Sequence, residues 1–473
     1  MSQDTPSARG PKLSMPATFA FAAPHIPIAA LTLAVAVHLP RYFASTLGMS
    51  LALVGAAFAL VRFIDIPLDP LLGLAMDRTK TRLGRYRVWS LLGAPVLMLA
   101  FYMLINSPAG VGQLYLMGWL LVMYLGFSIL LLSNLAWAAT LTTDYAQRSR
   151  IFGVFTGLGV TGAVAVLIIP VVMEKLGYSD GQGVRAMVWF IIISTPIAAL
   201  LAAFTPEPAS RDRAHPTFAL KDYWTLLTRG NVLRILAADL CVTLGPGWMA
   251  AIYLFFFKDS RGFTTTQSNL LLMIYIAAGF AGAPFTAWLA NKISKHRALM
   301  FNTTVYSLML TTLMLVPKGD FLLAVPTMFT CGAMAAGLTV VIRAITGDIG
   351  DEIRLESGRE WMGLMYAMTN ATTKVAGAAS IFLTFTVLER VGYNAKAGAV
   401  NTPEAIHGLE LAYLIGPVFF VMLGGAFFIR YKLTAERHGE IRAELERRDA
   451  LYDQAPGLQS ITGEPGEVLP SSS

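Results

Sequence analysis

The stretch SLALVGAAFALVRFIDIPLDPLLGLA, residues 50–75, is almost entirely apolar but carries three charges near its centre, Arg62, Asp65 and Asp69. An apolar run of about 20 residues is long enough to cross the hydrocarbon layer of a membrane as a helix. Side chains three, four and seven positions apart lie on one face of a helix. We therefore predict a membrane-spanning helix whose charged face points into a bundle of other helices.

The composition of the whole chain agrees with a membrane protein. Of its 473 residues, 55% are hydrophobic and only 14% are charged, and the mean hydropathy is +0.59. A soluble protein has roughly a quarter of its residues charged, so this chain cannot cover itself with a water-compatible surface. Intrinsic disorder is excluded for the same reason. Cys241 and Cys331 lie in apolar runs, which argues against a disulfide framework and against thiol or zinc chemistry.

Twelve apolar runs are long enough to span a membrane, and the longest internal polar stretch separates six of them from the other six. The fold class predicted is therefore an all-α membrane protein with twelve transmembrane helices in two six-helix bundles. The runs cover residues 18–40, 50–75, 88–106, 113–140, 151–173, 186–205, 231–257, 267–289, 298–316, 321–342, 361–388 and 408–429.

The polar segments give the predicted domain boundaries. Residues 1–17 form a cytoplasmic amino terminus, 18–205 the first bundle, 206–230 a cytoplasmic linker and 231–429 the second bundle. Residues 430–473 are charged and then rich in Gly, Pro and Ser, which predicts a disordered cytoplasmic tail. No cleavable signal peptide is expected before the first span.

The positive charges predict the orientation of the chain. If the amino terminus is cytoplasmic, 25 of the 36 Lys and Arg residues lie in cytoplasmic segments, 8 on the opposite side and 3 within spans. The positive-inside rule then places both termini in the cytoplasm. The net charge of +7 is distributed between the apolar runs and not in one basic patch, so no nucleic-acid partner is expected.

Asp65 and Asp69 are the first candidates for a functional site. A charge at the bilayer centre costs about 2.5–3.5 kcal/mol even on the mildest insertion scale. Two neighbouring carboxylates also repel each other unless a cation or a proton lies between them. We predict that they bind Na+ or H+ and that Arg62 takes part in coupling. The alternative is a structural ion pair between Arg62 and one of the acids.

Lys374 is the only lysine deep within a predicted span. A lysine at that depth needs an anionic partner, and the acids of the second span are the obvious candidates. Lys374 is therefore predicted to couple cation binding to movement of the two bundles. The alternative is that its side chain extends to the membrane interface.

The substrate pathway is predicted from polar groups in other spans. Asp239 in the seventh span is followed by Gly245-Pro246-Gly247-Trp248, which is expected to break or kink the helix. Substrate contacts are expected at Asp239, Trp248 or Tyr253, with a gating salt bridge of Asp239 as the alternative.

His25, between Pro24 and Pro27, is predicted to titrate or to donate to substrate, and the alternative is a packed histidine. Further polar side chains either line the pathway or bond between helices, namely Ser128, Ser133, Asn134, Asn370 and Thr373.

The loop after the second span carries a second candidate feature. Asp77 at the helix end beside a basic loop can latch helix ends together in one conformation. The predicted gating residues are Gly73, Asp77, Arg78, Arg82 and Arg85, although charges that only set topology are an equal alternative. No phosphate loop, histidine pair or nucleophile elbow occurs in a suitable context. We expect no enzyme activity, no organic cofactor and no metal beyond the coupling cation.

Two blocks of the chain resemble one transporter family. Residues 62–73, with Arg82, Gly84, Arg85 and Trp89, resemble the second helix and loop of the glycoside-pentoside-hexuronide:cation symporters, the melibiose permease group of the major facilitator superfamily. Residues 344–352 with 357–359, Lys374 and Gly392-Tyr393 resemble that family's tenth and eleventh helices.

The resemblance implies the major facilitator fold and symport of a glycoside or other sugar with a cation. It also implies that Asp65 and Asp69 bind the cation and that Lys374 lies near them. Ser128, one turn before the family's helix-four position near Leu131, is the third residue predicted to bind the cation. The protein is then expected to be monomeric, in a bacterial inner membrane.

The family's sugar transporters use acids on helices one and four, and this chain has none there. A related branch that carries lysophospholipids with sodium is therefore an alternative, as is an uncoupled facilitator or exporter.

Overall fold

The computed structural model describes residues 13–108, 112–141, 145–207, 220–359, 361–431 and 433–454, and this part of the chain contains helices and no β-strand. The helices before the linker are α1 (Met15–Ala22), α2 (His25–Leu33), α3 (Leu39–Ser45), α4 (Leu51–Arg78), α5 (Tyr86–Ile105), α6 (Gln113–Leu141), α7 (Tyr145–Lys175) and α8 (Asp180–Ala203). The others are α9 (Leu220–Leu227), α10 (Gly230–Phe255), α11 (Thr265–Ile293), α12 (Lys295–Thr312), α13 (Phe321–Ser357), α14 (Met362–Arg390), α15 (Pro403–Ala426) and α16 (Ala435–Gln454).

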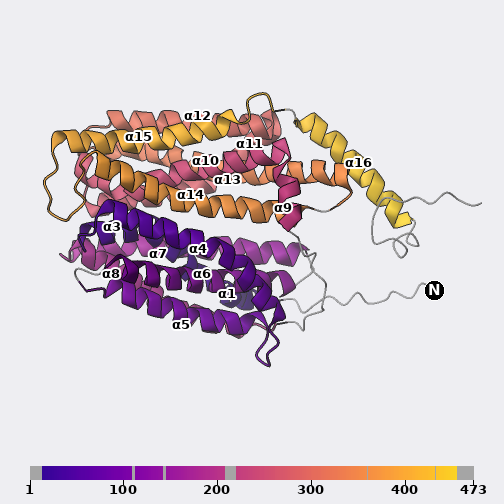
Figure 1. Cartoon of the computed structure of the whole chain (residues 1–473), viewed down its shortest axis with the longest axis horizontal. Coiled ribbons are helices and arrows are strands. Elements are labelled where there is room, and N and C mark those ends of the chain that lie inside the picture. Colours follow the sequence, from indigo (N-terminus) through magenta and orange to yellow (C-terminus); the bar gives the residue numbers. More distant parts are fainter. Residues whose placement is uncertain are drawn as a thin grey trace, which may run out of the picture.

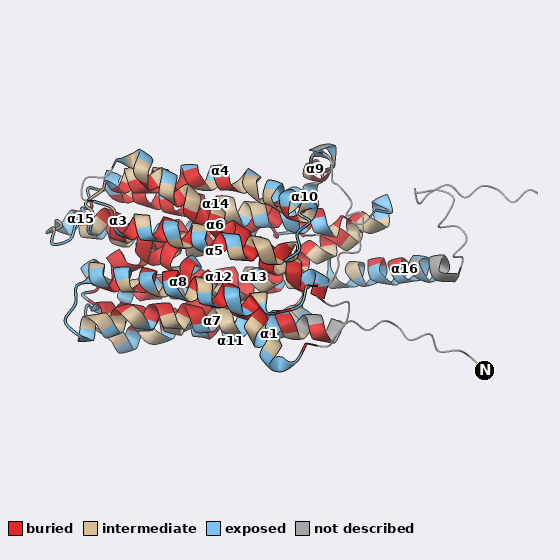
Figure 2. Ribbon diagram, turned by 90° about the horizontal axis from the view of Figure 1, so that it is seen from below, coloured by how far each residue is buried: buried red, intermediate tan, exposed pale blue. Residues whose placement is uncertain are grey.

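Twelve helical segments of the described residues are long and apolar enough to cross a membrane, which confirms the predicted fold class. Hydroxyl groups cap the amino-terminal turns of α4, α8, α11 and α15; in α4, for example, Ser50 Oγ accepts from Leu53 N at 3.3 Å. Exposed positions run along the outer faces of the spanning helices (Figure 2). Many of them carry large apolar side chains, where a soluble protein would place polar groups. The protein is therefore an integral multi-pass membrane protein.

The first span is interrupted, whereas most others are single helices. It consists of α1, α2, a π-helical turn η1 (Ala34–His38) and α3. Pro24, Pro27 and Pro40 lie in this span and lack the backbone N–H that a regular helix uses. The seventh span ends in a second π-helical turn, η2 (Phe256–Ser260), and the ninth in a short 3₁₀ turn, η3 (Leu313–Leu315).

Helices α1–α8 form one bundle and α10–α15 form a second beside it (Figure 1). The two bundles meet where α4 packs along α14 and where α7 packs along α11. The start of α1 and all of α16 lie at the same end of the molecule, which we call the terminal end, and the opposite end is the far end (Figure 1). Residues 208–219 of the predicted linker, like 1–12 of the predicted amino terminus, lie outside the described residues, and α9 occupies the rest of the linker's length.

The predicted disordered tail is wrong for residues 435–454, which form α16. Two apolar side chains of this helix are buried, Ile441 at 2% and Leu445 at 5% exposure. His438 Nε2 lies 3.0 Å from Asp351 Oδ2 and 3.3 Å from Asp348 Oδ1, both on α13. The high charge content that suggested disorder instead supplies contacts to α13 and ion pairs within the helix. Residues 455–473 of the tail lie outside the described residues.

Candidate functional site

Four charged side chains meet where α4 packs along α14. Lys374 Nζ lies 2.9 Å from Asp65 Oδ2 and also forms an ion pair with Asp69. Arg62 Nη1 lies 3.0 Å from the same oxygen of Asp65. Lys374 belongs to the second bundle and the other three residues to the first, so this charge cluster joins the two bundles.

The local structure of α4 explains why its three charges converge. The helix continues through Pro67 and Pro70, so the spacing of three and four residues predicted from the sequence is kept. Asp65 and Asp69 thereby both face Lys374 of α14, and Arg62 reaches Asp65 from the preceding turn of α4. The structure also places Lys374 against the acids that its depth in the span suggested as partners.

Helix α6 completes the surroundings of the cluster. Asp65 is fully buried, and Ser128 Oγ donates to its Oδ1 at 3.3 Å. The guanidinium of Arg62 lies 4.5 Å from the centre of the Tyr124 ring, within range of a cation–π contact. Tyr124 was not among the predicted site residues, although it lies four positions before Ser128 and thus on the same face of α6.

The cluster has the chemistry of a binding site for a small hard cation. Its oxygens are two carboxylates and one hydroxyl, the donors that such ions prefer. Asp69 Oδ1 is buried and has no hydrogen-bond partner among the described residues, so it has the capacity to accept another bond. Two acids and two bases make the cluster neutral as it stands, and an added cation must therefore compete with Lys374 or Arg62 for the carboxylates.

His25, Ser133 and Asn134 lie within the first bundle and are largely committed to internal contacts. His25 Nε2 lies 3.1 Å from Asn134 Oδ1, and its ring stacks on Phe155 with 3.8 Å between the ring centres. Asn134 Nδ2 donates to the carbonyl of Phe21 at 3.4 Å, and Ser133 Oγ donates to the carbonyl of Leu130. This geometry favours the alternative of a packed histidine.

Asp239 is linked to the charge cluster through α14. It is buried at 7% exposure and accepts from Thr372 Oγ1 at 2.5 Å and from Thr373 Oγ1 at 3.4 Å. Both threonines directly precede Lys374. In this structure no ion pair of Asp239 is found in the described ranges, and its hydrogen bonds come from the two threonine hydroxyls. Asn370, one turn before Lys374 on α14, is exposed.

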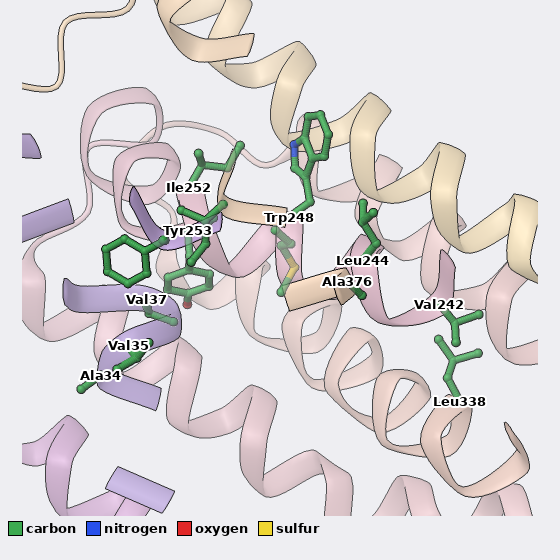
Figure 3. Packing of buried hydrophobic residues seen from close by; sticks show 14 of the residues in the cluster. Ala34, Val35, Val37, Val242, Leu244, Trp248, Ile252, Tyr253, Leu338 and Ala376 are labelled. Atoms are coloured by element: carbon green, nitrogen blue, oxygen red, sulfur yellow. The ribbon is translucent and has the colours of Figure 1, made fainter. Parts of the chain in front are cut away.

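Trp248 and Tyr253 are packed in the second bundle and do not belong to the candidate site (Figure 3). Trp248 Nε1 donates to the carbonyl of Ala412 at 2.9 Å, and Tyr253 Oη donates to that of Ser268 at 2.9 Å.

Of the break or kink expected at Gly245-Pro246-Gly247, the break does not occur, because α10 continues through these residues. The glycines instead permit close packing: a Cβ on Gly245 would lie 2.5 Å from Val421, and one on Gly247 would lie 2.4 Å from Ser380 Oγ.

The predicted gating loop is held mainly by an acid that the sequence did not single out. Glu207 accepts hydrogen bonds from the backbone N–H groups of Arg85, Tyr86 and Arg87 at 2.8, 2.8 and 3.2 Å and thus caps α5. Asp77 Oδ1 accepts from Tyr86 Oη at 2.9 Å.

These contacts all lie within the first bundle, so they fix the loop without joining the two bundles. Of the other predicted residues, Gly73 and Arg78 lie in the last turns of α4 and Arg82 lies in the loop. Arg78 and Arg82 are exposed, and a Cβ on Gly73 would meet no atom within 4 Å.

Comparison with known proteins places the chain in a family. Residues 20–435 match the family model of the MFS/sugar transport proteins. The match covers more than half of the chain, so the chain belongs to this family.

Similar curated proteins include two bacterial symporters and one vertebrate symporter. The uncharacterized symporter YnaJ of Bacillus subtilis is 23% identical over 443 residues, which cover 88% of this chain and 92% of that protein. The putative glycoside/cation symporter YagG of Escherichia coli is 23% identical over 427 residues, with the same coverage of 88% and 92%. The sodium-dependent lysophosphatidylcholine symporter 1 of Xenopus tropicalis is 21% identical over 433 residues, covering 81% of each chain.

A solved structure shows the same fold. The crystal structure of the nucleoside transporter NupG matches with a TM-score of 0.66 and 13% identity, covering 89% of this chain and all of that one. At this identity the match supports the arrangement of the helices and carries no information about the substrate.

Proposed function

We propose that this member of the MFS/sugar transport family is a secondary active transporter that couples movement of a glycoside or other sugar to Na+ or H+ by alternating access. The observation that carries the proposal is Lys374, which extends from one bundle to both Asp65 and Asp69 of the other. Relatives named as symporters, one of them for glycosides and cations, support it. The proposal assigns transport and no catalytic step.

Cation binding and bundle movement are linked in this proposal by competition. In the present arrangement the ammonium of Lys374 neutralises the carboxylates of α4. A cation bound between Asp65 and Asp69, with Ser128 nearby, neutralises the two carboxylates in place of Lys374. The electrostatic attraction between Lys374 and the carboxylates is then weaker. The contact between the bundles is then weakened, so the ion shifts the balance between conformations.

The substrate lies between the bundles in this proposal, near the charge cluster. Thr372 and Thr373 directly precede Lys374 on α14, and both donate hydrogen bonds to Asp239 of α10. Contacts with substrate at Asp239, Asn370 and Thr373 are part of the proposal. A lysophospholipid is the second candidate, because one relative is named for lysophosphatidylcholine and the predicted helices one and four lack acids.

The proposed setting is a bacterial inner membrane with both termini in the cytoplasm. The distribution of Lys and Arg and the bacterial relatives support it. The protein is proposed to act as a monomer, with the lipid bilayer, the substrate and the coupling ion as its partners. No organic cofactor and no nucleic acid enter the proposal.

The first experiment is a thermal-shift screen of the purified protein with glycosides and lysophospholipids, each in Na+ and in choline at two pH values. A ligand that binds only the folded protein raises its apparent stability. We expect a glycoside to stabilise the protein more strongly when Na+ or low pH is present. Stabilisation by lysophospholipids alone would transfer the protein to the lipid-carrying branch.

Uptake into proteoliposomes then tests coupling. Asp69→Asn is expected to abolish accumulation driven by an ion gradient, with Glu404→Gln, an exposed acid at the far end, as the matched control. Unchanged gradient-driven uptake in Asp69→Asn would contradict the cation-binding role. Uptake by the parent that ignores the gradient would identify an uncoupled facilitator.

A further inference from the structure

A short sequence occurs twice, at the far end of each bundle. Residues 174–178 read EKLGY and follow the fifth span, and residues 389–393 read ERVGY and follow the eleventh. Each stretch begins at the carboxyl end of its helix, α7 in the first bundle and α14 in the second. The two copies therefore occupy the same position in the two halves of the protein.

The two copies also have the same backbone structure. Gly177 has a φ of 81° and Gly392 one of 74°, in the left-handed region that favours glycine. Tyr178 N donates to the carbonyl of Met173 at 2.9 Å, and Tyr393 N donates to that of Leu388 at 3.0 Å, so both turns close five residues back. Because the two turns have the same geometry, Glu174 and Glu389 occupy equivalent positions at the ends of their helices.

Glu174 uses this position to contact the other bundle. Thr265 N donates to its Oε1 at 3.1 Å, and Thr266 N donates to its Oε2 at 2.5 Å. Thr266 Oγ1 donates to the same Oε2 at 2.6 Å. These groups form the first turn of α11, so a side chain of the first bundle caps a helix of the second.

Glu389 makes the reciprocal contact. Ala52 N, in the first turn of α4, donates to Glu389 Oε2 at 2.8 Å. The second bundle thereby caps a helix of the first. Each capped helix also has a hydroxyl cap from its own bundle, Ser50 for α4 and Thr264 for α11, which leaves the glutamates to bind N–H groups that would otherwise lack a partner.

Other contacts between the bundles cluster around the two caps. Asp180 at the start of α8 pairs with Lys258 of the second bundle and accepts from Thr265 Oγ1 at 2.6 Å. Ala397 N donates to the carbonyl of Ser45 at 3.0 Å. Closure at this end is thus held by directional bonds from both bundles.

We propose that Glu174 and Glu389 are a matched pair of positioning residues that hold the far end of the transporter closed by capping each other's bundle. Both caps bond only while the ends of α7 and α11, and of α14 and α4, are in contact. Separation of the bundles at this end breaks both at once, so the pair favours the conformation that is closed there. The inference goes beyond the proposed function, because it holds for any substrate and for any coupling ion.

Distance measurement between the bundles tests the proposal directly. Spin labels are attached to two introduced cysteines, Leu114→Cys in the first bundle and Leu315→Cys in the second. Both positions are exposed and lie at the far end, whereas the two native cysteines are buried. The double variant Glu174→Ala/Glu389→Ala is compared with the parent and with Glu404→Ala, which removes an exposed acid at the same end. The distance between the two labels is measured by double electron–electron resonance in the absence of substrate, so the result does not depend on transport.

The expected result is a second, longer distance population in the double variant. A cap of ordinary strength changes an equilibrium about fivefold, so two independent caps change the open-to-closed ratio by about 25-fold. Single variants should lie between the parent and the double variant. The proposal would be overturned if the double variant showed the same distances as Glu404→Ala. A lower melting temperature of the double variant without a change in distance would also overturn it, because the glutamates would then be ordinary helix caps.

Discussion

Replacing Lys374 by methionine should make the stability of the protein depend on a cation. In the parent, Asp65 and Asp69 face Arg62 and Lys374, two acids and two bases. Lys374→Met keeps a side chain of similar length but leaves one carboxylate without a counter-charge. We expect the purified variant to unfold at lower temperature than the parent in choline at high pH. Added Na+, or low pH if the coupling ion is a proton, should restore the loss.

The magnitude follows from the burial of the three side chains. Removing one partner of a buried ion pair costs about 3–5 kcal/mol. Asp65 is fully buried, but Lys374 and Asp69 retain 17% and 26% of their side-chain exposure. We therefore expect the lower end, about 3 kcal/mol, since solvent screens the exposed part. A cation present at 100 times its dissociation constant stabilises the folded state by about 2.7 kcal/mol, which nearly cancels the loss.

A second variant separates the charge effect from lost packing. Lys374→Met/Asp69→Asn removes one base and one acid, so Arg62 again balances Asp65. It should recover most of the stability in choline and show no response to Na+. Lys396→Met, at an exposed lysine, is the control for removing a positive charge. An equal loss in Na+ and in choline at both pH values, unrelieved by Asp69→Asn, would refute the reasoning.

Four further substitutions test the packing at other sites. Glu207→Ala removes the cap of α5 and should lower the unfolding free energy by about 1–2 kcal/mol in thermal denaturation, and no change would show that the cap is replaced by water. Gly282→Ala should lower the unfolding free energy by about 1–3 kcal/mol, because the added Cβ would lie 2.0 Å from the carbonyl oxygen of Ala333. The matched control Gly377→Ala, where a Cβ meets no atom within 4 Å, should leave the unfolding free energy unchanged or raise it by up to about 1 kcal/mol. Ile441→Asp should detach α16 and accelerate proteolysis within residues 435–454, and an unchanged cleavage rate would contradict the docking of that helix.

The sequence predicted the fold and the core of the charge cluster for the same physical reason. Apolar length determines which segments span a membrane, and helical spacing determines which charges share a face. The cost of an isolated charge in lipid then required a partner for Lys374, and Asp65 and Asp69 were the acids available at that depth. These rules act within one helix or between two, so no knowledge of the whole packing was needed.

Contacts that depend on packing could not be predicted in this way. Glu207 has no local sequence signal that marks it, and Tyr124 is marked only by its spacing of four residues from Ser128. Their roles come from where α6 and the end of α8 lie. Trp248 was expected in the pathway because Gly-Pro-Gly suggests a broken helix, but α10 is continuous, Trp248 packs within the second bundle, and the glycines bring α10 close to its neighbours. The sequence analysis missed helix α16 because disorder was inferred from the charge content of the tail alone. Ile441, an apolar residue among these charges, is buried in the structure.

The neutrality of the charge cluster has an electrical consequence. Two carboxylates and two basic side chains sum to zero, so binding of Na+ or H+ gives the loaded site one positive charge. Moving one elementary charge across the membrane potential is worth about 2.3 kcal/mol per 100 mV. In the proposed transport cycle, membrane voltage therefore acts on the reorientation of the loaded transporter and hardly at all on the return of the empty one. Under the proposed function, accumulation is driven by voltage as well as by the ion concentration difference.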